Sequence, residues 1–310
     1  MKIAYLIMAH TDPVQLNRLI KSLDTDDSVF YIHIDKKVDV KLFRDTVEKN
    51  DSNIQFVDNK DRVSVYWGGF SQVKAIFVLI ESWLKGNHKD CGRVVLLSGL
   101  DYPIVSNTEI RRFFNVHPNR EFIKGYNLSI HPDSFRKAVY TMFYDIPNLF
   151  ILLSLKYLFK IIPYQRKRQV FFNGKYNDVY NGATWWVLTP QCVEYVYAVY
   201  IKEKKLSNYF RYSTCPDEKF IPTIILNSKF RHNAEIIESE TSPDLTERTP
   251  LHLAGYKYDD EIKKYAIYEY KKEDFSEIIT SKKMFFRKAT TAKALDLMNL
   301  IDDWRCGSIT

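Results

Sequence analysis

Two nearly continuous apolar runs near the start of the chain most constrain its fold. Residues 2–9 (KIAYLIMA) and 28–34 (SVFYIHI) have the pattern of strands that helices cover on both faces. Between them, Asp12 is suited to cap a helix and Pro13 to occupy its first position. The apolar residues of this helix then recur at helical spacing, at Leu16, Leu19, Ile20 and Leu23. The sequence therefore begins with a β-α-β unit, which requires a parallel sheet.

The alternation of strand and helix continues beyond this unit. We expect further strands at 54–57 and 93–99, and helices at 71–84 and 107–115. This order predicts an α/β fold with a mixed, mostly parallel central sheet flanked by helices. In such sheets, ligands bind at the carboxyl ends of the strands.

The length and composition favour one folded catalytic domain over the 310 residues. With 45% hydrophobic residues the chain can bury a substantial core, and no linker or repeat interrupts it. The predicted parts are an N-terminal half at 1–125, a second half at 126–240 that holds the helical insertion, and a C-terminal wrap at 241–310. The formal charge of +7 suits an anionic partner such as a nucleotide, a lipid surface or a nucleic acid.

The cysteines and the N-terminal run bear on the cellular compartment. The four cysteines have neither zinc-site nor C-x-x-C spacing, so we expect free thiols in a reducing compartment; they are Cys91, Cys192, Cys215 and Cys306. The apolar run that ends at His10 lacks a cleavage site, which argues against a secretory signal. These features predict a cytoplasmic location.

Residues 145–175 form a helical insertion with two open interpretations. The stretch 145–162 begins with Asp145 as a candidate cap and is apolar almost all round, but its two lysines argue against a spanning helix. Six basic residues and no acidic one lie between Lys156 and Lys175. The segment is therefore either a peripheral contact with an anionic membrane or a helix docked on the core before a solvated basic loop.

Two carboxylates are expected at the carboxyl ends of neighbouring strands. Asp35 follows strand 28–34 and can accept hydrogen bonds from a ribose or a base edge, or it caps the next helix. Asp101 follows strand 93–99 and joins the same site, or it serves as a turn residue. We expect His33, between two isoleucines, to be an internal histidine.

Aromatic residues beside small residues mark two further stretches. In VYWGGFSQ (65–72), Trp67 precedes Gly68 and Gly69, and Ser71 lies near a helix start, where phosphate groups bind; an ordinary turn is the alternative. In NGATWWVLT (181–189), the adjacent Trp185 and Trp186 should face opposite sides of a strand. One of the two can then offer a flat face to a sugar, unless both pack in the core.

The stretch STCPDEKFIPTII (213–225) holds the strongest candidate for a base. Asp217 and Glu218 fall near a helix N-terminus, where a single acid would suffice for capping. A base that removes a hydroxyl proton needs a carboxylate beside the sugar and partly shielded from water, which Glu218 suits better because of its longer reach.

A departing diphosphate needs positive charge, which either basic side chains or a metal ion can supply. Arg287 and Lys288, in KKMFFRKATT (282–291), can supply it in place of a metal, or they form a solvated basic face. The only Asp-x-Asp, at 24–26, lies at the wrong edge of the sheet for a metal site.

Seven stretches occur in an order that resembles the Core-2/I-branching β-1,6-N-acetylglucosaminyltransferase family, which includes the protein O-xylosyltransferases. They are AYLIMAHTDPVQLNRLIKSL, YIHIDKK, VYWGGFS, LLSGLDYPI, GATWWVLT, PDEKFIPTIILNS and MFFRKA. The resemblance implies a GT-A fold, a UDP-sugar donor carrying GlcNAc or xylose, inversion to a β-linkage, and no metal or other cofactor.

The resemblance also implies a role for each matching residue. Glu218 would be the catalytic base. The donor would be bound by His10, Asp35, Trp67, Gly68, Arg248, Arg287 and Lys288, and the sugar or acceptor by Asp101, Thr184, Trp185 and Asp217. The family uses a second diphosphate-binding cation before the lysine, and here Arg248 and Lys264 compete for that role. No residue is assigned to a metal.

The expected partners follow from the same resemblance. A bacterial member of this kind would add a sugar to a glycan or a lipid-linked saccharide at the inner face of the plasma membrane, and we expect no nucleic-acid partner. Two alternatives stay open: a metal-dependent transferase that uses Asp35 and a histidine, and a non-catalytic protein that binds nucleic acid or another anionic ligand.

Overall fold

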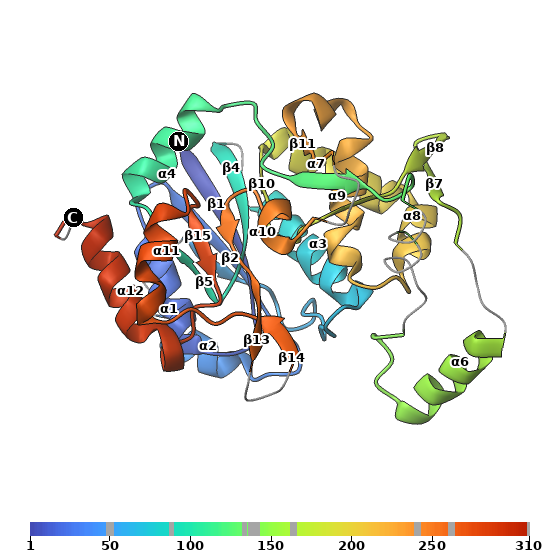
Figure 1. Cartoon of the computed structure of the whole chain (residues 1–310), viewed down its shortest axis with the longest axis horizontal. Helices are drawn as coiled ribbons and strands as arrows, with labels where there is room; N and C mark the ends of the chain where they lie inside the picture. The colour runs from blue at the N-terminus through green and yellow to red at the C-terminus, as the bar shows by residue number, and fades with distance from the viewer. Residues whose placement is uncertain are drawn as a thin grey trace.

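The structure of the chain is a computed structural model that describes residues 1–47, 53–86, 90–131, 135, 143–161, 166–238, 243–259 and 264–308. Its central sheet has five strands in the order β10-β4-β1-β2-β3 (Figure 1). All pairs are parallel except the pair of β10 with β4. The strands are β1 (Lys2–Ala9), β2 (Ser28–Ile34), β3 (Ile54–Phe56), β4 (Cys91–Ser98) and β10 (Val187–Leu188). The predicted mixed, mostly parallel α/β fold is confirmed.

Side chains along β1 alternate between two hydrophobic cores, one on each face of the sheet. Tyr5 and Ile7 pack with α1 (Pro13–Leu23), α2 (Val40–Thr46) and α4 (Asn107–Val116). Ala4 and Leu6 pack with the helices of the other face, which are α3 (Phe70–Lys85), α7 (Pro190–Lys202), α8 (Lys204–Phe210) and α9 (Phe220–Leu226). Since both faces are covered, the central strands are expected to be mostly apolar, as their sequences are.

Local signals in the sequence predicted the first helix, α1, and its capping residue correctly. The Asp12 carboxylate accepts a hydrogen bond from the Gln15 amide at 3.1 Å and Pro13 is the first residue of α1, as predicted. The strands predicted at 54–57 and 93–99 and the helices predicted at 71–84 and 107–115 differ from the observed ones by at most two residues at either end.

Smaller sheets and helices complete the second half of the chain. The strands are β5 (Asp101–Pro103), β6 (Lys124–Asn127), β7 (Gln169–Phe172), β8 (Lys175–Asp178), β9 (Tyr180–Gly182), β11 (Glu235–Ile236), β12 (His252–Leu253), β13 (Tyr256–Asp259), β14 (Lys264–Ile267) and β15 (Phe285–Arg287). The helices are α6 (Leu149–Ile161), η1 (Pro216–Glu218), η2 (Lys229–Asn233), α10 (Leu245–Arg248), η3 (Lys272–Asp274), α11 (Phe275–Thr280) and α12 (Thr291–Arg305). The proposed division into halves and a wrap stays a prediction.

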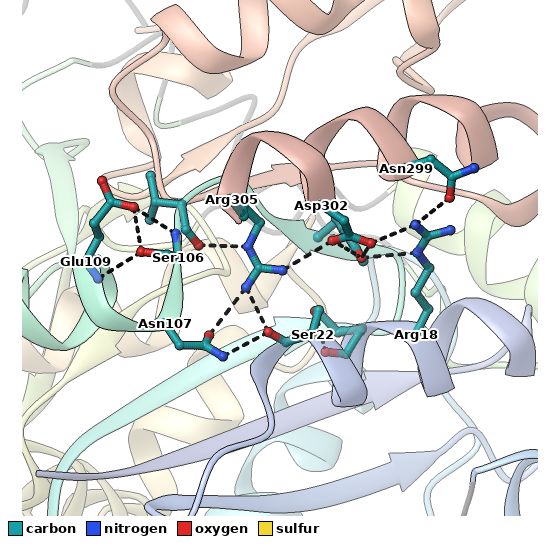
Figure 2. A network of polar contacts seen from close by, with 11 residues as sticks. Arg18, Ser22, Ser106, Asn107, Glu109, Asn299, Asp302 and Arg305 are labelled. Carbon is teal, nitrogen blue, oxygen red and sulfur yellow. Dashed lines mark hydrogen bonds and ion pairs between the residues drawn. The ribbon is translucent and has the colours of Figure 1, made fainter. Parts of the chain in front are cut away.

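The last helix, α12, packs back on the start of the chain (Figure 1). Figure 2 shows the polar contacts that fasten it. Asp302 accepts a 2.7 Å hydrogen bond from Arg18 of α1, and Arg305 donates to the Ser22 carbonyl at 2.8 Å and to the Val105 carbonyl at 3.0 Å. This contact holds β15, which lies just before α12, beside β5.

The helical insertion differs from its predicted form at its start. α6 begins at Leu149, and the Asn148 side chain accepts a hydrogen bond from the Ile151 amide at 3.1 Å. Asp145, expected to cap this helix, instead accepts hydrogen bonds from the Ser71 amide and hydroxyl at the start of α3. Residue 162, the expected end of the helix, lies outside the described residues. No helix in the described part of the chain combines the length and apolarity needed to cross a membrane.

Candidate active site

A cavity of about 400 Å³ lies at the carboxyl ends of β1, β2 and β4, where the sheet order predicts ligand binding. It is lined by all the residues that sequence analysis proposed for the site except Asp101 and Arg248. These lining residues are His10, Asp35, Trp67, Gly68, Thr184, Trp185, Asp217, Glu218, Arg287 and Lys288. The fold therefore brings together side chains that are far apart in the sequence. His10 and Lys288, for example, are separated by 278 positions.

Glu218 ends the short helix η1 and faces Arg248. Its Oε2 lies 2.9 Å from Nη1 of Arg248, which also donates to the Gly182 carbonyl at 2.7 Å. Burial acts to lower the pKa of Arg248, but the charge and hydrogen bond of Glu218 outweigh it and raise this pKa. The side chain of Glu218 is 20% exposed.

This pairing changes the role that we assign to Arg248. Sequence analysis placed it among the diphosphate-binding cations, but its guanidinium is satisfied by a carboxylate and a carbonyl and it does not line the cavity. Its position at the end of α10, against Glu218, suits it to orient that side chain. The side chain of its competitor, Lys264, lies outside the described part of the structure.

Asp217 points into a buried polar cluster beside Glu218. Its Oδ2 accepts hydrogen bonds from the Thr184 hydroxyl at 2.5 Å and from Gln72 at 3.0 Å. Burial, assisted by the negative charge of Glu218, raises the pKa of Asp217 to about 6.

This raised pKa gives a testable dependence of stability on pH. The unfolded carboxyl ionises near its ordinary pKa of 3.8 and the folded one near 6, so the folded state holds the proton more tightly between these values. The contribution of Asp217 to stability is therefore complete below about pH 4 and is lost as the pH rises through 6. The loss amounts to about 3 kcal/mol. In urea unfolding, the stability of the natural chain relative to Asp217→Asn should fall by this amount between pH 4 and 7.

The exposed Asp303 supplies the control for this measurement. Asp303→Asn should track the natural chain across the same range of pH. A difference between the natural chain and Asp217→Asn that does not change with pH would contradict the assignment.

The wall of the cavity next to β2 is formed by Asp35, His10 and His33. Oδ1 of Asp35 accepts a hydrogen bond from the Lys37 amide at 2.9 Å, and Nζ of Lys37 lies 3.5 Å from Oδ2. Burial lowers the pKa of His10, and Lys288, Lys37 and Arg287 lower it further while Asp35 opposes them. His33 is internal, as expected: its Nε2 accepts a hydrogen bond from the Val63 amide, and burial lowers its pKa to about 4.

Trp67 and Gly68 form the outer part of the cavity. Trp67 is 69% exposed, and its ring packs edge-on against Tyr144 with centroids 6.2 Å apart. Gly68 has a φ of +74°, and a Cβ there would lie 3.2 Å from the Tyr144 ring. The start of α3, expected to suit a phosphate, already holds the Asp145 carboxylate, which lies 3.0 Å from the Ser71 amide. That helix start is therefore occupied by the protein's own anion.

Trp185 and Arg287 stack at the inner end of the cavity. The Arg287 guanidinium lies 4.3 Å from the centroid of the Trp185 ring, whereas Trp186 is buried in the core. The two tryptophans thus point in different directions, as expected, although their backbone is not part of a strand. Burial lowers the pKa of Arg287, and burial together with the charge of Arg287 lowers the pKa of Lys288.

Asp101 lies behind Arg287 and does not reach the cavity. Its side chain is fully buried, accepts a hydrogen bond from the Ser98 amide at 2.8 Å and lies 3.7 Å from Nε of Arg287. Antiparallel pairing of β5 with β15 sets Asp101 opposite Arg287 and turns the carboxylate inward. The predicted contact with sugar or acceptor is therefore corrected to a contact with Arg287.

Several residues near the site carried no recognisable signal in the sequence. His252 has a ring nitrogen, Nε2, 3.3 Å from Asp101, and Gln72 bonds to Asp217. Tyr256 and Lys37 line the cavity. Lys37 and Gln72 are the last residues of the stretches YIHIDKK and VYWGGFSQ, and this position is the signal that could have found them. Among the described residues, no group of three or more histidine, cysteine or acidic side chains could hold a metal ion.

Comparison with known proteins identifies the family. A sequence model described as "Branch: Core-2/I-Branching enzyme" matches residues 3–279. Xylosyltransferase 2 of Rattus norvegicus is 26% identical over 235 residues, which cover 73% of this chain and 25% of that protein. Xylosyltransferase oxt of Drosophila melanogaster is 25% identical over 237 residues, covering 74% and 24%. The chain spans about a quarter of the length of these curated relatives.

Solved structures give weaker likenesses. The apo form of mouse xyloside xylosyltransferase 1 has a TM-score of 0.34 and 13% identity, covering 77% of this chain and 86% of that one. A 4-diphosphocytidyl-2C-methyl-D-erythritol synthase from Anaerococcus prevotii has a TM-score of 0.37 and 14% identity, covering 76% of this chain and 86% of that one. The family match, in contrast, runs through β1, β2, β4 and Glu218 and covers most of the chain. The chain belongs to the Core-2/I-branching enzyme family of glycosyltransferases.

Proposed function

We propose that this protein is an inverting glycosyltransferase that moves a sugar from a UDP-sugar to a hydroxyl group and forms a β-linkage. The observation that carries the proposal is the shared cavity of Glu218, Arg287 and Lys288. A carboxylate that can take a proton and cations that can stabilise a departing diphosphate are the two groups that such a transfer needs. The family supports a sugar transfer, and the names of the relatives favour xylose over GlcNAc as the donor sugar.

The proposed donor lies along the ends of the strands. Asp35 and Trp67 bind the uridine, with Gly68 allowing close approach of the backbone. Lys288 and Arg287 bind the diphosphate. Two buried nitrogens of Arg287, Nε and Nη1, have no hydrogen-bond partner in the described part of the structure. Buried N–H groups of this kind favour an anionic ligand, because leaving them unpaired is costly.

The proposed reaction is a single displacement at the anomeric carbon. The acceptor hydroxyl passes its proton to Glu218 as its oxygen bonds to the anomeric carbon, and the bond from that carbon to the diphosphate breaks on the opposite side. The electron pair of the broken bond leaves with UDP, whose added charge Lys288 and Arg287 stabilise. The salt bridge to Arg248 needs Glu218 as a carboxylate, which is the form that a base requires.

We propose that the cations act without a divalent metal, and that the acceptor is a glycan or a lipid-linked saccharide. Buried positive side chains can perform the electrostatic task of a metal at a leaving group, since their charge is weakly screened there. Thr184, Trp185 and Asp217 line the same cavity as Glu218, and we assign them to the sugar and acceptor.

A combined binding and transfer experiment tests this function. UDP should raise the melting temperature by several degrees at saturating concentration, while oligonucleotides should leave it unchanged. A screen of UDP-sugars that includes UDP-xylose and UDP-GlcNAc should reveal hydrolysis or transfer, and a chelator should not abolish it. No response to any uridine nucleotide would contradict the function. Activity that a chelator removes and manganese restores would contradict the metal-free mechanism.

A further inference from the structure

The helix α6 presents apolar side chains to solvent. Phe150, Leu153 and Tyr157 are 80%, 56% and 70% exposed and follow one another at the i, i+3, i+7 spacing of a single helix face. Ile151 and Leu158 flank them and are also exposed, so we call these five residues the apolar face of α6. Figure 1 shows α6 standing apart from the sheets and the other labelled helices. A water-facing stripe of this size indicates an interaction surface.

Two polar side chains beside this face have hydrogen-bond partners within the helix. The Ser154 hydroxyl donates to the Phe150 carbonyl at 2.9 Å, and the Asn148 side chain accepts the hydrogen bond of the Ile151 amide at the first turn. Transfer of the face into an apolar medium therefore leaves neither of these two polar groups without a partner.

The charges around α6 indicate which kind of partner can bind its apolar face. From residue 146 to residue 177 the sequence has six lysines and arginines and no acidic residue. Of these, Lys167 and Arg168 are exposed in the described segment after the helix. Symmetric pairing with a second copy would bring two such basic segments together. An anionic lipid surface is complementary to both the charge and the apolar face.

We propose that α6 binds the surface of an anionic bilayer, with its apolar face among the upper acyl chains and the basic segment against the headgroups. Its 13 residues give a length of about 20 Å, short of the roughly 30 Å of a hydrocarbon core. The helix therefore lies in the plane of the interface. Phe150 and Tyr157, as aromatic residues, suit that depth.

The segment that leads into α6 is fastened to the wall of the cavity. Tyr144 packs against Trp67 and over Gly68, and Asp145 bonds to both the amide and the hydroxyl of Ser71. Only four peptide steps separate Asp145 from Leu149, a reach of at most about 14 Å. Binding of α6 to a bilayer therefore holds the exposed side of the cavity near that surface. This consequence rests on the proposed function: it favours an acceptor carried on a lipid.

Vesicle co-sedimentation tests the proposal without any donor or activity. The protein should bind vesicles of phosphatidylcholine mixed with phosphatidylglycerol, and bind phosphatidylcholine alone weakly, with the difference shrinking as salt is added. Phe150→Gln/Leu153→Gln/Tyr157→Gln should weaken binding at least about tenfold while keeping good helix formers in α6. Lys167→Gln/Arg168→Gln should weaken binding to the anionic vesicles roughly twenty-five-fold, at about fivefold for each cation.

A matched control variant and a second measurement show whether a loss of vesicle binding is specific to α6. Leu42→Gln/Val116→Gln/Leu295→Gln changes three apolar side chains that are exposed on other helices, and it should bind like the natural chain. Stabilisation by UDP should survive in every variant, so loss of membrane binding and failure of the proposed function are separable. Absence of binding to anionic vesicles, or binding that the α6 variant retains, would overturn the proposal. So would a dimer in solution that the α6 variant dissolves, because the face would then belong to a second copy.

Discussion

Replacing Glu218 by glutamine should lower the rate of sugar transfer by about a hundredfold to ten-thousandfold, the range ascribed to a positioned general base. Glutamine keeps the shape of the side chain and can still accept a hydrogen bond from Arg248, but it cannot take the acceptor proton. The distance of 2.9 Å between the two side chains makes this contact geometrically simple to retain. Turnover should therefore fall while the affinity for UDP changes little.

The exposed Glu238 provides the control for this experiment. Glu238→Gln makes the same chemical change away from the cavity and should leave turnover unaffected. Asp217→Asn distinguishes the roles of the two adjacent acids. Asp217 is buried and already accepts hydrogen bonds from Thr184 and Gln72, so we do not expect it to act as the base. If Glu218→Gln kept full turnover and Asp217→Asn lost it, the base would have been assigned to the wrong member of the pair.

Replacing Lys288 by alanine should lower the affinity for UDP by roughly tenfold to a hundredfold and kcat/KM by more than that. Burial and the nearby Arg287 lower the pKa of this lysine, so its positive charge is costly in the empty cavity. A diphosphate beside it would remove that cost and would gain further charge as the sugar leaves, when the interaction becomes stronger.

A comparison of UDP with uridine shows whether Lys288 binds the diphosphate or only supports the fold of the cavity. Lys288→Ala should weaken the binding of UDP, measured by calorimetry, and leave uridine binding unchanged, because in the proposed complex only the diphosphate contacts the lysine. Lys288→Arg should recover part of the loss, and Lys272→Ala, at an exposed lysine, should have no effect. Equal losses for UDP and uridine would mean that the lysine supports the fold of the cavity and does not bind the diphosphate.

Arg287 is less suitable for such a test because of its buried surroundings. Its guanidinium stacks on Trp185 and faces Asp101, which is fully buried and also lies close to His252. Removing the arginine would leave the buried Asp101 carboxylate without this cation, and breaking a buried pair in this way costs about 3–5 kcal/mol. A loss of activity in Arg287→Ala would therefore mix catalysis with stability.

The sequence by itself determined the parallel strands of the central sheet and ten of the residues that line the cavity. Continuous apolar runs and helical spacing are local signals, and they predicted β1, β2 and α1 closely because both faces of the sheet are covered. A residue that directly follows a parallel strand must lie at the carboxyl edge of the sheet. For this reason Asp35 could be placed in the site before any contact was known.

The tertiary structure alone decided which partner each charged side chain has. Arg248 faces Glu218 across 30 residues of sequence, Asp145 caps a helix that begins 75 residues before it, and pairing of β5 with β15 turns Asp101 away from the cavity. No spacing or periodicity encodes such contacts, because they arise only when distant elements pack together. The physical reason is that the pattern of buried residues can be read from one segment of sequence, whereas the partner of a charged side chain depends on how two distant segments pack.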